Sequence, residues 1–254
     1  MGSQQKPYQQ ALEAFQREIG QRVQILKVEE VPAGLPSDAK VIVALGGRAA
    51  IQAYPPGVAL VYGLAPGVVE QRRRSTTVKV QMIPRPVKLL GKVKELQPGL
   101  ARLGVLWSAA GSEYYVRELR KAGETLDVEV VERRLAGPDE LPEALRALAG
   151  KVDALWLPPD PSLINLHSLE TIKQFSWANA VPFYAPSAGM LDYGAVASVD
   201  ASFAEIGRAL ARAARSASGG SAPPVMYPEE AVTSINSKAA SEVGLKIPAG
   251  AARP

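Results

Sequence analysis

Tryptophan and tyrosine residues lie where apolar runs end in the middle of this 254-residue sequence. Trp107 closes LGVLW, Trp156 lies in DALWLPPD and Tyr184 lies in VPFYAPS. Such near-continuous apolar runs are typical of parallel strands, and open parallel sheets bind ligands at the carboxyl ends of their strands. Rings at those ends predict a site for a small organic molecule, with Trp107 and Tyr184 among its contacts. The alternative is that the rings only fill the core.

A glycine pair and an arginine follow an earlier buried strand. The segment KVIVALGG (40–47) leads into a helix from about Ala49, which places Gly46, Gly47 and Arg48 at the helix start. Free backbone N–H groups at such a start attract anions, and Arg48 is favourable there if an anion lies between. We expect a carboxylate to bind here. A tight turn with Arg48 in solvent is the alternative.

Further polar residues lie just past strand ends. Asp160 precedes Pro161, which suits a helix N-cap, and ligand contact is its second interpretation. Ser108 and Ser187 could donate to a ligand or serve as turn residues, and Tyr62 ends the strand VALVYG. The predicted ligand-binding set is Gly46, Gly47, Arg48, Tyr62, Trp107, Ser108, Asp160, Tyr184 and Ser187.

The composition leaves little room for catalysis. The sequence has no cysteine and one histidine, His167, which falls in a helical run and is interpreted as a structural side chain. It contains no nucleophile elbow, phosphate loop or dinucleotide fingerprint. We therefore expect no enzyme activity, no cofactor and no metal. The net charge of +4 is scattered and the run 72–74 is interpreted as a solvated loop, so nucleic acid is not an expected partner.

The elements that position these residues are predicted to form two α/β units. The first contains a helix at 6–20, strands at 23–31, 40–47 and 57–64, and a half-exposed edge strand at 76–82. A helix at 84–99 leads to the second, with strands at 103–107, 128–135 and 153–160 and helices near 112–126, 139–149 and 162–178. Ser202 and Glu205 form a capping box that opens a helix reaching about Ser216.

The order of several short motifs carries a family resemblance. The chain contains, in sequence, ARLGVLW, AGKVDALWLPPD, AVPFYAPSAG, GAVASVDASFAEIGRALARAA and TSINSKAASEVGLKIP. This order resembles the substrate-binding proteins of bacterial ABC importers, and most closely the group that contains tryptophan- and tyrosine-binding lipoproteins. The segment QMIPRPVKLLGKVKELQPG is similar to the crossover between the two lobes of that family.

The resemblance implies a fold and a function. The fold would be α/β, with two Rossmann-like lobes of parallel sheets in the type I periplasmic-binding-protein architecture. Lobe one would comprise 1–97 and 200–220, and lobe two 98–199 and 221–254. A small amino-acid-like ligand, aromatic first and branched aliphatic second, would bind in the cleft by hinge closure. The alternative is a ligand-sensing or partner-binding protein of the same fold with no transport role.

The implied partners are an ABC permease and ATPase. The protein would be periplasmic or exported, and would meet a membrane only through the permease or a removed anchor. No apolar run approaches the roughly 20 residues of a membrane span, and MGSQQKPYQQ has no apolar signal core.

Two departures from the family pattern bear on lobe one. Family members begin with a strand before the first helix, whereas five polar residues precede Lys6 here. Lobe one is thus expected to lack its first strand, through either a truncated start or a rearrangement, and another segment or another chain would fill the gap. The second departure is GGRAA (46–50), where relatives carry a small hydroxyl residue or proline in place of Gly47 and Arg48, so ligand contacts there are expected to differ.

Overall fold

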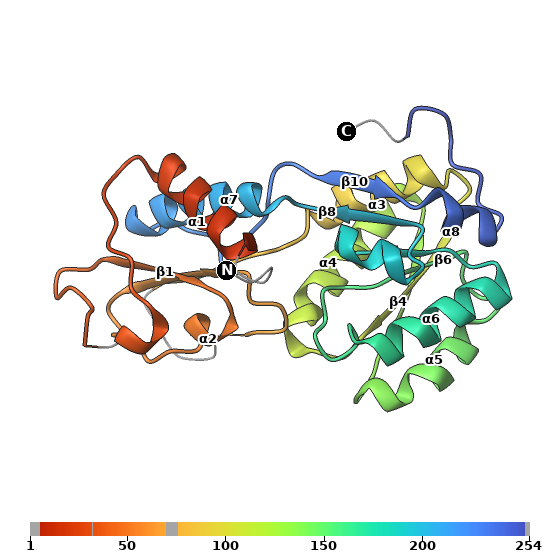
Figure 1. Cartoon of the computed structure of the whole chain (residues 1–254), viewed down its shortest axis with the longest axis horizontal. Coiled ribbons are helices and arrows are strands. Elements are labelled where there is room, and N and C mark those ends of the chain that lie inside the picture. Colours follow the sequence, from red (N-terminus) through yellow and green to blue (C-terminus); the bar gives the residue numbers. More distant parts are fainter. Residues whose placement is uncertain (1–5, 32, 70–75, 252–254) are drawn as a thin grey trace. The chain divides into compact units, whose positions relative to one another are not determined.

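The chain folds into two compact units (Figure 1). The computed structural model describes residues 6–31, 33–69 and 76–251. Unit 1 comprises Met1–Met82 with Ala201–Glu230, and unit 2 comprises Ile83–Asp200 with Ala231–Pro254. The predicted lobe boundaries place 83–97 in lobe one and 221–230 in lobe two, whereas contacts assign both segments to the other unit. The reason is that the helix at 86–96 packs on the helix at 113–126, and the strand at 225–226 pairs within unit 1.

Unit 1 contains a parallel four-stranded sheet in the order β1-β2-β3-β9. Its strands are β1 (Val41–Leu45), β2 (Ala59–Gly63), β3 (Thr77–Val80) and β9 (Val225–Met226). The prediction that 76–82 forms an edge strand is wrong, because β9 pairs with β3 through Lys79 and Val225. The partner strand comes from a segment far along the chain, which the local alternation of polar and apolar residues does not reveal.

The predicted strand at 23–31 does not form. Residues 21–27 have no regular secondary structure, and a short 3-10 helix, η1 (Val28–Glu30), follows. A β-strand satisfies its backbone N–H and C=O groups only beside another strand. No described strand lies next to this segment, so its β-branched residues alone do not make it a strand.

Two helices that are distant in sequence cover one face of the unit 1 sheet. The helix α1 (Lys6–Ile19) packs against α7 (Phe203–Ser218), and the two lie side by side in Figure 1. Small residues make this approach close, because a Cβ added at Gly207 would overlap the carbonyl oxygen of Ala11 and lie 3.0 Å from the Cβ of Ala14. The side chains between the helices and the sheet form the apolar core of unit 1.

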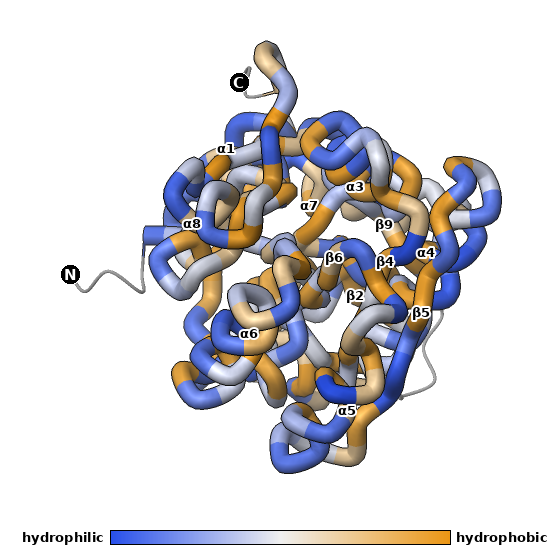
Figure 2. Tube along the Cα trace, turned by 90° about the vertical axis from the view of Figure 1, so that its right-hand side faces the viewer, coloured by the Kyte–Doolittle hydropathy of each residue, from blue (hydrophilic) through white to orange (hydrophobic). Residues whose placement is uncertain are grey.

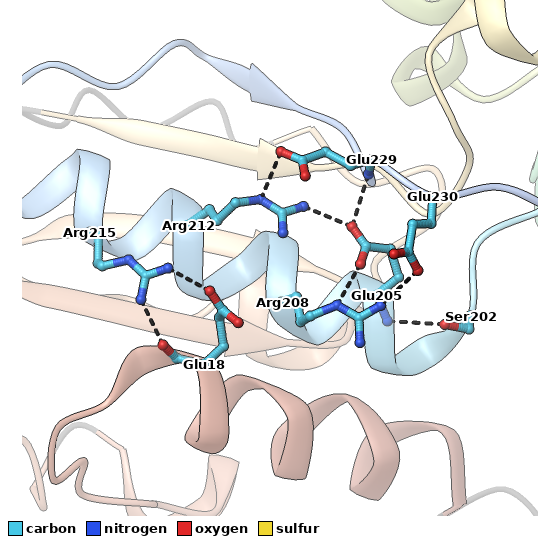
Figure 3. A network of polar contacts seen from close by, with 8 residues as sticks. All are labelled: Glu18, Ser202, Glu205, Arg208, Arg212, Arg215, Glu229 and Glu230. Atoms are coloured by element: carbon cyan, nitrogen blue, oxygen red, sulfur yellow. Dashed lines mark hydrogen bonds and ion pairs between the residues drawn. The ribbon is translucent and has the colours of Figure 1, made fainter.

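An ion network anchors the start of α7 (Figure 3). The predicted N-cap is confirmed, since the N–H of Glu205 donates to Ser202 Oγ at 3.1 Å. The carboxylate of Glu205, 2% exposed, accepts hydrogen bonds from Arg208 at 2.7 Å, Arg212 at 2.8 Å and the backbone N–H of Glu229 at 2.9 Å. Burial alone would raise the pKa of Glu205, but these hydrogen bonds hold it below its usual value. The network ties α7 to the segment that follows β9.

Unit 2 contains a six-stranded sheet in the order β10-β8-β7-β6-β4-β5. Its strands are β4 (Arg102–Trp107), β5 (Glu129–Arg134), β6 (Ala154–Trp156), β7 (Phe183–Ala185), β8 (Ala197–Asp200) and β10 (Val232–Ile235). All pairs are parallel except β8 with β10. The predicted strands 103–107, 128–135 and 153–160 thus correspond to β4, β5 and β6.

Helices cover both faces of the unit 2 sheet. They are α3 (Pro86–Leu96), α4 (Glu113–Leu126), α5 (Leu141–Leu148) and α6 (Leu166–Asn179), with α8 (Ser237–Glu242) near the chain end. The helices α5 and α6 share one apolar cluster with alternate residues of β4, β6 and β7. Figure 2 shows hydrophilic and hydrophobic residues alternating around both helices, as expected for elements that cover a sheet face. Because β4 to β8 run parallel to one another, the loops that follow these strands gather at one edge of the sheet.

Candidate ligand site

Asp160 joins two loops at the carboxyl edge of the unit 2 sheet. Its Oδ2 accepts the N–H groups of Ser108 at 2.7 Å and Ala109 at 2.6 Å, and its Oδ1 accepts the N–H of Ser162 at 3.0 Å. The residue is fully buried. The N-cap prediction is wrong, because α6 begins later and is capped by Asn165. Asp160 fixes the loop after β4 to the turn after β6, so it positions Ser108 rather than presenting a free carboxylate.

A second aspartate does the same for the loop after β7. Asp200 ends β8, and its Oδ2 accepts the N–H of Ala188 at 2.8 Å and the hydroxyl of Ser198 at 3.2 Å. Burial raises the pKa of Asp200, and the two hydrogen bonds oppose that rise. Ser187 is exposed on the loop that this aspartate holds. Sequence reasoning missed Asp200, for which the signal is a carboxylate ending the buried run ASVD.

The aromatic residues of unit 2 are more enclosed than the sequence suggests. Tyr184 is fully buried, and its hydroxyl donates to Gln97 Oε1 at 3.0 Å, while burial raises its pKa above the usual value. Trp156 stacks on Tyr115 with ring centroids 5.3 Å apart. The indole Nε1 of Trp156 is buried and has no hydrogen-bond partner among the described residues. Buried donors without partners are rare, so this N–H is a candidate contact for a ligand group or a water.

Trp107 faces the edge strand β5. Its Nε1 donates to Glu132 Oε2 at 3.3 Å, and the guanidinium of Arg134 lies 5.1 Å from the ring centroid. The ring is 6% exposed, so Trp107 is less enclosed than Tyr184. Its backbone continues into Ser108, which Asp160 holds. Of the predicted residues, the structure therefore brings Trp107, Ser108 and Asp160 directly together.

The predicted anion site in unit 1 has fewer free N–H groups and a shorter helix than expected. Gly46 adopts φ of 96°, and its N–H donates to the carbonyl of Gly63 at 2.9 Å, so the expectation of a free N–H there is wrong. The helix that follows, α2 (Gly47–Ala50), has only four residues. Arg48 is exposed and forms an ion pair with Glu29 at 3.5 Å. Exposed pairs of this kind contribute little to stability, so Arg48 remains able to turn toward another anion.

Tyr62 and a lysine that the sequence analysis missed lie on neighbouring strands. Tyr62 is buried on β2, in register with Ala44 on β1 and Lys79 on β3. Burial lowers the pKa of Lys79 to about 8, and its ammonium donates to the carbonyl of Val68 at 3.0 Å. The signal that could have found Lys79 is a lysine between two valines, Val78 and Val80, both of which are buried on β3. Gly46, Gly47, Arg48 and Tyr62 thus belong to unit 1, and the other predicted residues to unit 2.

Neither a metal-binding cluster nor a helix able to cross a membrane occurs among the described residues. No group of three or more histidine, cysteine or acidic residues suited to a metal ion occurs in that part of the chain. His167 is exposed on α6. Within the same residues, no helix combines the length and apolar character needed to cross a bilayer.

Comparison with known proteins places the chain in a family. A family model described as ABC transporter substrate binding protein matches residues 81–250, more than half of the chain. A tyrosine-binding protein of Clostridioides difficile (strain R20291) is 28% identical over 122 residues, which are 47% of this chain and 35% of that protein. The chain therefore matches about a third of the length of this curated relative.

Solved structures show the same fold. The ABC domain of Streptococcus pneumonia in complex with L-Trp has a TM-score of 0.61 at 19% identity, covering 95% of this chain and 92% of that one. The ligand-free, open structure of a substrate-binding protein with adhesive properties from Clostridium difficile has a TM-score of 0.62 at 16% identity, covering 96% and 91%. Likeness at this identity shows the fold alone, and it confirms the type I periplasmic-binding-protein architecture. The family consists of substrate-binding proteins rather than enzymes, which confirms that prediction on family grounds. This chain belongs to the ABC transporter substrate-binding protein family.

Proposed function

We propose that this protein is the solute-binding component of a bacterial ABC importer for a small amino-acid-like molecule. Aromatic amino acids are the first candidates and branched aliphatic ones the second. Hinge closure of the two lobes would capture the ligand, which would pass to a permease driven by an ATPase. The protein would act in the periplasm or as an exported protein. Two similar proteins, one a tyrosine-binding protein and one solved in complex with L-Trp, support the choice of ligand class.

The observation that carries this proposal is the carboxyl edge of the unit 2 sheet. Asp160 and Asp200 fix the loops that bear Ser108 and Ser187. Fixed loops bind with little loss of conformational entropy. At the same edge, β6 ends in Trp156, whose indole N–H is without a partner among the described residues. A pre-organised polar edge beside rings suits a ligand with an apolar or aromatic body.

We assign the ligand's carboxylate to the first turn after β1. The N–H of Gly47 donates to no other described residue, and the exposed guanidinium of Arg48 holds Glu29 only at 3.5 Å. Both are donors that an incoming carboxylate could use. In unit 2, Trp107 is the residue that we propose for contact with the apolar body of the ligand. Tyr184 in unit 2 and Tyr62 in unit 1 are buried, and each would support the binding residues of its own unit from the core.

A binding panel tests this proposal. Aromatic amino acids, branched aliphatic amino acids, organic acids, sugars and nucleosides would each be added to the protein in a thermal-shift assay. A ligand that binds only the folded state stabilises it by about 2.7 kcal/mol at a hundredfold excess over its Kd. We expect the aromatic amino acids to give the largest shift. A panel in which only sugars or nucleosides raise the Tm would refute the ligand class.

Two variants locate the site. Titration calorimetry would measure Kd directly, because substituting a packed ring also changes stability. Trp156→Phe keeps the ring on Tyr115 but removes the indole N–H. We expect it to weaken binding by about tenfold, the equivalent of one hydrogen bond. We expect Trp107→Ala to abolish binding. Trp177→Ala, at a side chain 42% exposed on α6, is the control and should bind like the parent.

A further inference from the structure

Lys79 is a half-buried basic residue within the sheet of unit 1. It lies on β3 in register with Tyr62 on β2, and residues in register on parallel strands point to the same face of a sheet. Its neighbours Val78 and Val80 point to the opposite face, into the core between the sheet and α7. Lys79 therefore shares a face with Tyr62, and this face carries a separate, smaller apolar cluster.

The ammonium of Lys79 reaches the carboxyl edge of this sheet. Its Nζ donates to the carbonyl of Val68 at 3.0 Å, and Val68 belongs to the loop that follows β2. Val68 in turn packs beside the first turn after β1, because a Cβ added at Gly47 would lie 3.5 Å from Val68 Cγ2. Lys79 therefore contacts the residue that lines the turn to which we assign the ligand's carboxylate.

Burial makes this position costly for a charge. It lowers the pKa of Lys79 to about 8, because the ammonium loses water on a face that is otherwise apolar. A neutral donor would bind the carbonyl of Val68 without that cost, so holding the loop does not by itself explain a lysine here. An anion beside the ammonium would favour the charged form and offset the cost of burial. Because an ammonium has three N–H donors, it can bind a carbonyl and a carboxylate at the same time.

A second cation near this turn is far more exposed. The side chain of Arg48 is 81% exposed and lies 3.5 Å from Glu29. Water screens a charge in such a position, whereas a charge that is partly buried interacts more strongly with an anion. We therefore expect Lys79, rather than Arg48, to contribute most of the discrimination between a carboxylate and a neutral group.

We propose that Lys79 is the residue of unit 1 that selects ligands with a carboxylate, through an ion pair between its ammonium and that carboxylate. This inference rests on the proposed function, because it assigns an anion partner to the same ligand. It adds that a neutral derivative of that ligand binds poorly. The residues that carry the inference, namely Gly47, Tyr62, Val68 and Lys79, all belong to unit 1.

Calorimetric titration with amino acids and their amides tests the proposal. The probes are L-tryptophan, L-tyrosine and L-leucine, each compared with its own carboxamide at about pH 6.5. This pH lies below the pKa of about 8, so Lys79 is charged in the free protein. We expect whichever acid binds most tightly to bind at least about tenfold more tightly than its amide, because the amide cannot form the ion pair.

Two variants separate the charge from the hydrogen bond to the loop. Lys79→Gln keeps a donor for the carbonyl of Val68 but removes the charge, and Lys79→Met removes both while keeping an apolar side chain. We expect each variant to weaken binding of the acid at least about tenfold and binding of the amide less than about threefold. A purely structural role for Lys79 would weaken binding of both ligands to the same extent.

Lys94→Met is the matched control. Lys94 is a half-buried lysine on α3 in unit 2, and its Nζ likewise donates to a backbone carbonyl, that of Leu126, at 2.7 Å. Leu126 ends α4 just before β5 begins, so this lysine lies toward the amino edge of its sheet. We expect Lys94→Met to bind acid and amide like the parent.

The outcomes distinguish this inference from the proposed function. The role of Lys79 is overturned if the amide binds the parent as tightly as the acid, a comparison that needs no variant to fold. It is also overturned if the Lys79 variants, shown to be folded by circular dichroism, keep the parent's preference for the acid. In both cases the acids still bind, so the proposed ligand class stands. Failure of all three acids to bind the parent would refute that class together with the role of Lys79.

Discussion

The contact between α1 and α7 leads to a sharp prediction at Gly207. A methyl group there would overlap the carbonyl oxygen of Ala11, which belongs to a helix backbone and cannot turn aside as a flexible side chain could. The two helices would have to separate over the core of unit 1. We therefore expect Gly207→Ala to destabilise the protein although alanine is the better helix former.

The magnitude follows from two opposing effects. Alanine in place of glycine inside a helix stabilises by about 1 kcal/mol, whereas overpacking a close contact costs about 1–3 kcal/mol. Because the methyl group would meet helix backbone, the cost lies at the upper end of that range. We therefore expect a net loss of about 2 kcal/mol, which for a chain of this size lowers the Tm by about 4–8 °C. Urea unfolding followed by circular dichroism, together with calorimetric Tm values, measures both quantities.

Gly91 provides the matched control. It lies inside α3, and a Cβ added there meets nothing within 4 Å. Gly91→Ala should raise stability by about 0.5–1 kcal/mol through helix propensity alone. The reasoning would be refuted if Gly207→Ala proved as stable as the parent, or more stable, while Gly91→Ala raised the Tm.

Two further predictions concern buried carboxylates. Because the pKa of Glu205 is lowered in the fold, its contribution to stability is present above its ordinary value of 4.5 and is lost as pH falls through the lowered pKa. Glu205→Gln should thus cost on the order of 2 kcal/mol at pH 7 and clearly less at pH 3 in urea unfolding, and an equal cost at both would contradict the assignment. Asp160→Asn should destabilise by about 2–4 kcal/mol and speed amide exchange at Ser108 and Ala109, and unchanged exchange there would show that the carboxylate does not hold the loop.

The sequence was most informative where strands are buried on both faces. The runs LGVLW and DALWLPPD are apolar without interruption because helices cover both sides of β4 and β6. The same reasoning failed at 23–31, whose residues favour a strand, because strand formation depends on a neighbour supplied by another part of the chain. It failed at β3 for the converse reason, since the partner β9 lies more than a hundred residues away.

The candidate site could be predicted in position but not in orientation. Trp107, Ser108 and Asp160 were placed at the correct edge because parallel strands share one. The direction of a ring is decided by contacts that are remote in sequence, as for the hydroxyl of Tyr184, whose partner Gln97 precedes it by 87 residues. Asp160 looked like a helix cap because Pro161 follows it, but its nearest donors belong to the loop after β4. A short stretch of sequence does not contain hydrogen-bond partners that lie so far along the chain.

The placement of α7 against α1 also sets the order in which the chain can fold during synthesis. Arg215 and Glu18 bond to each other across 197 residues of sequence. The apolar faces of α1 and β1 to β3 therefore stay uncovered until the ribosome has released α7, roughly 10–30 s after it has made β3 at ordinary translation rates. The strands β4 to β8 and their helices emerge within that interval. Unit 2 can thus assemble most of its sheet while unit 1 still lacks α7, and unit 1 exposes apolar surface during that interval.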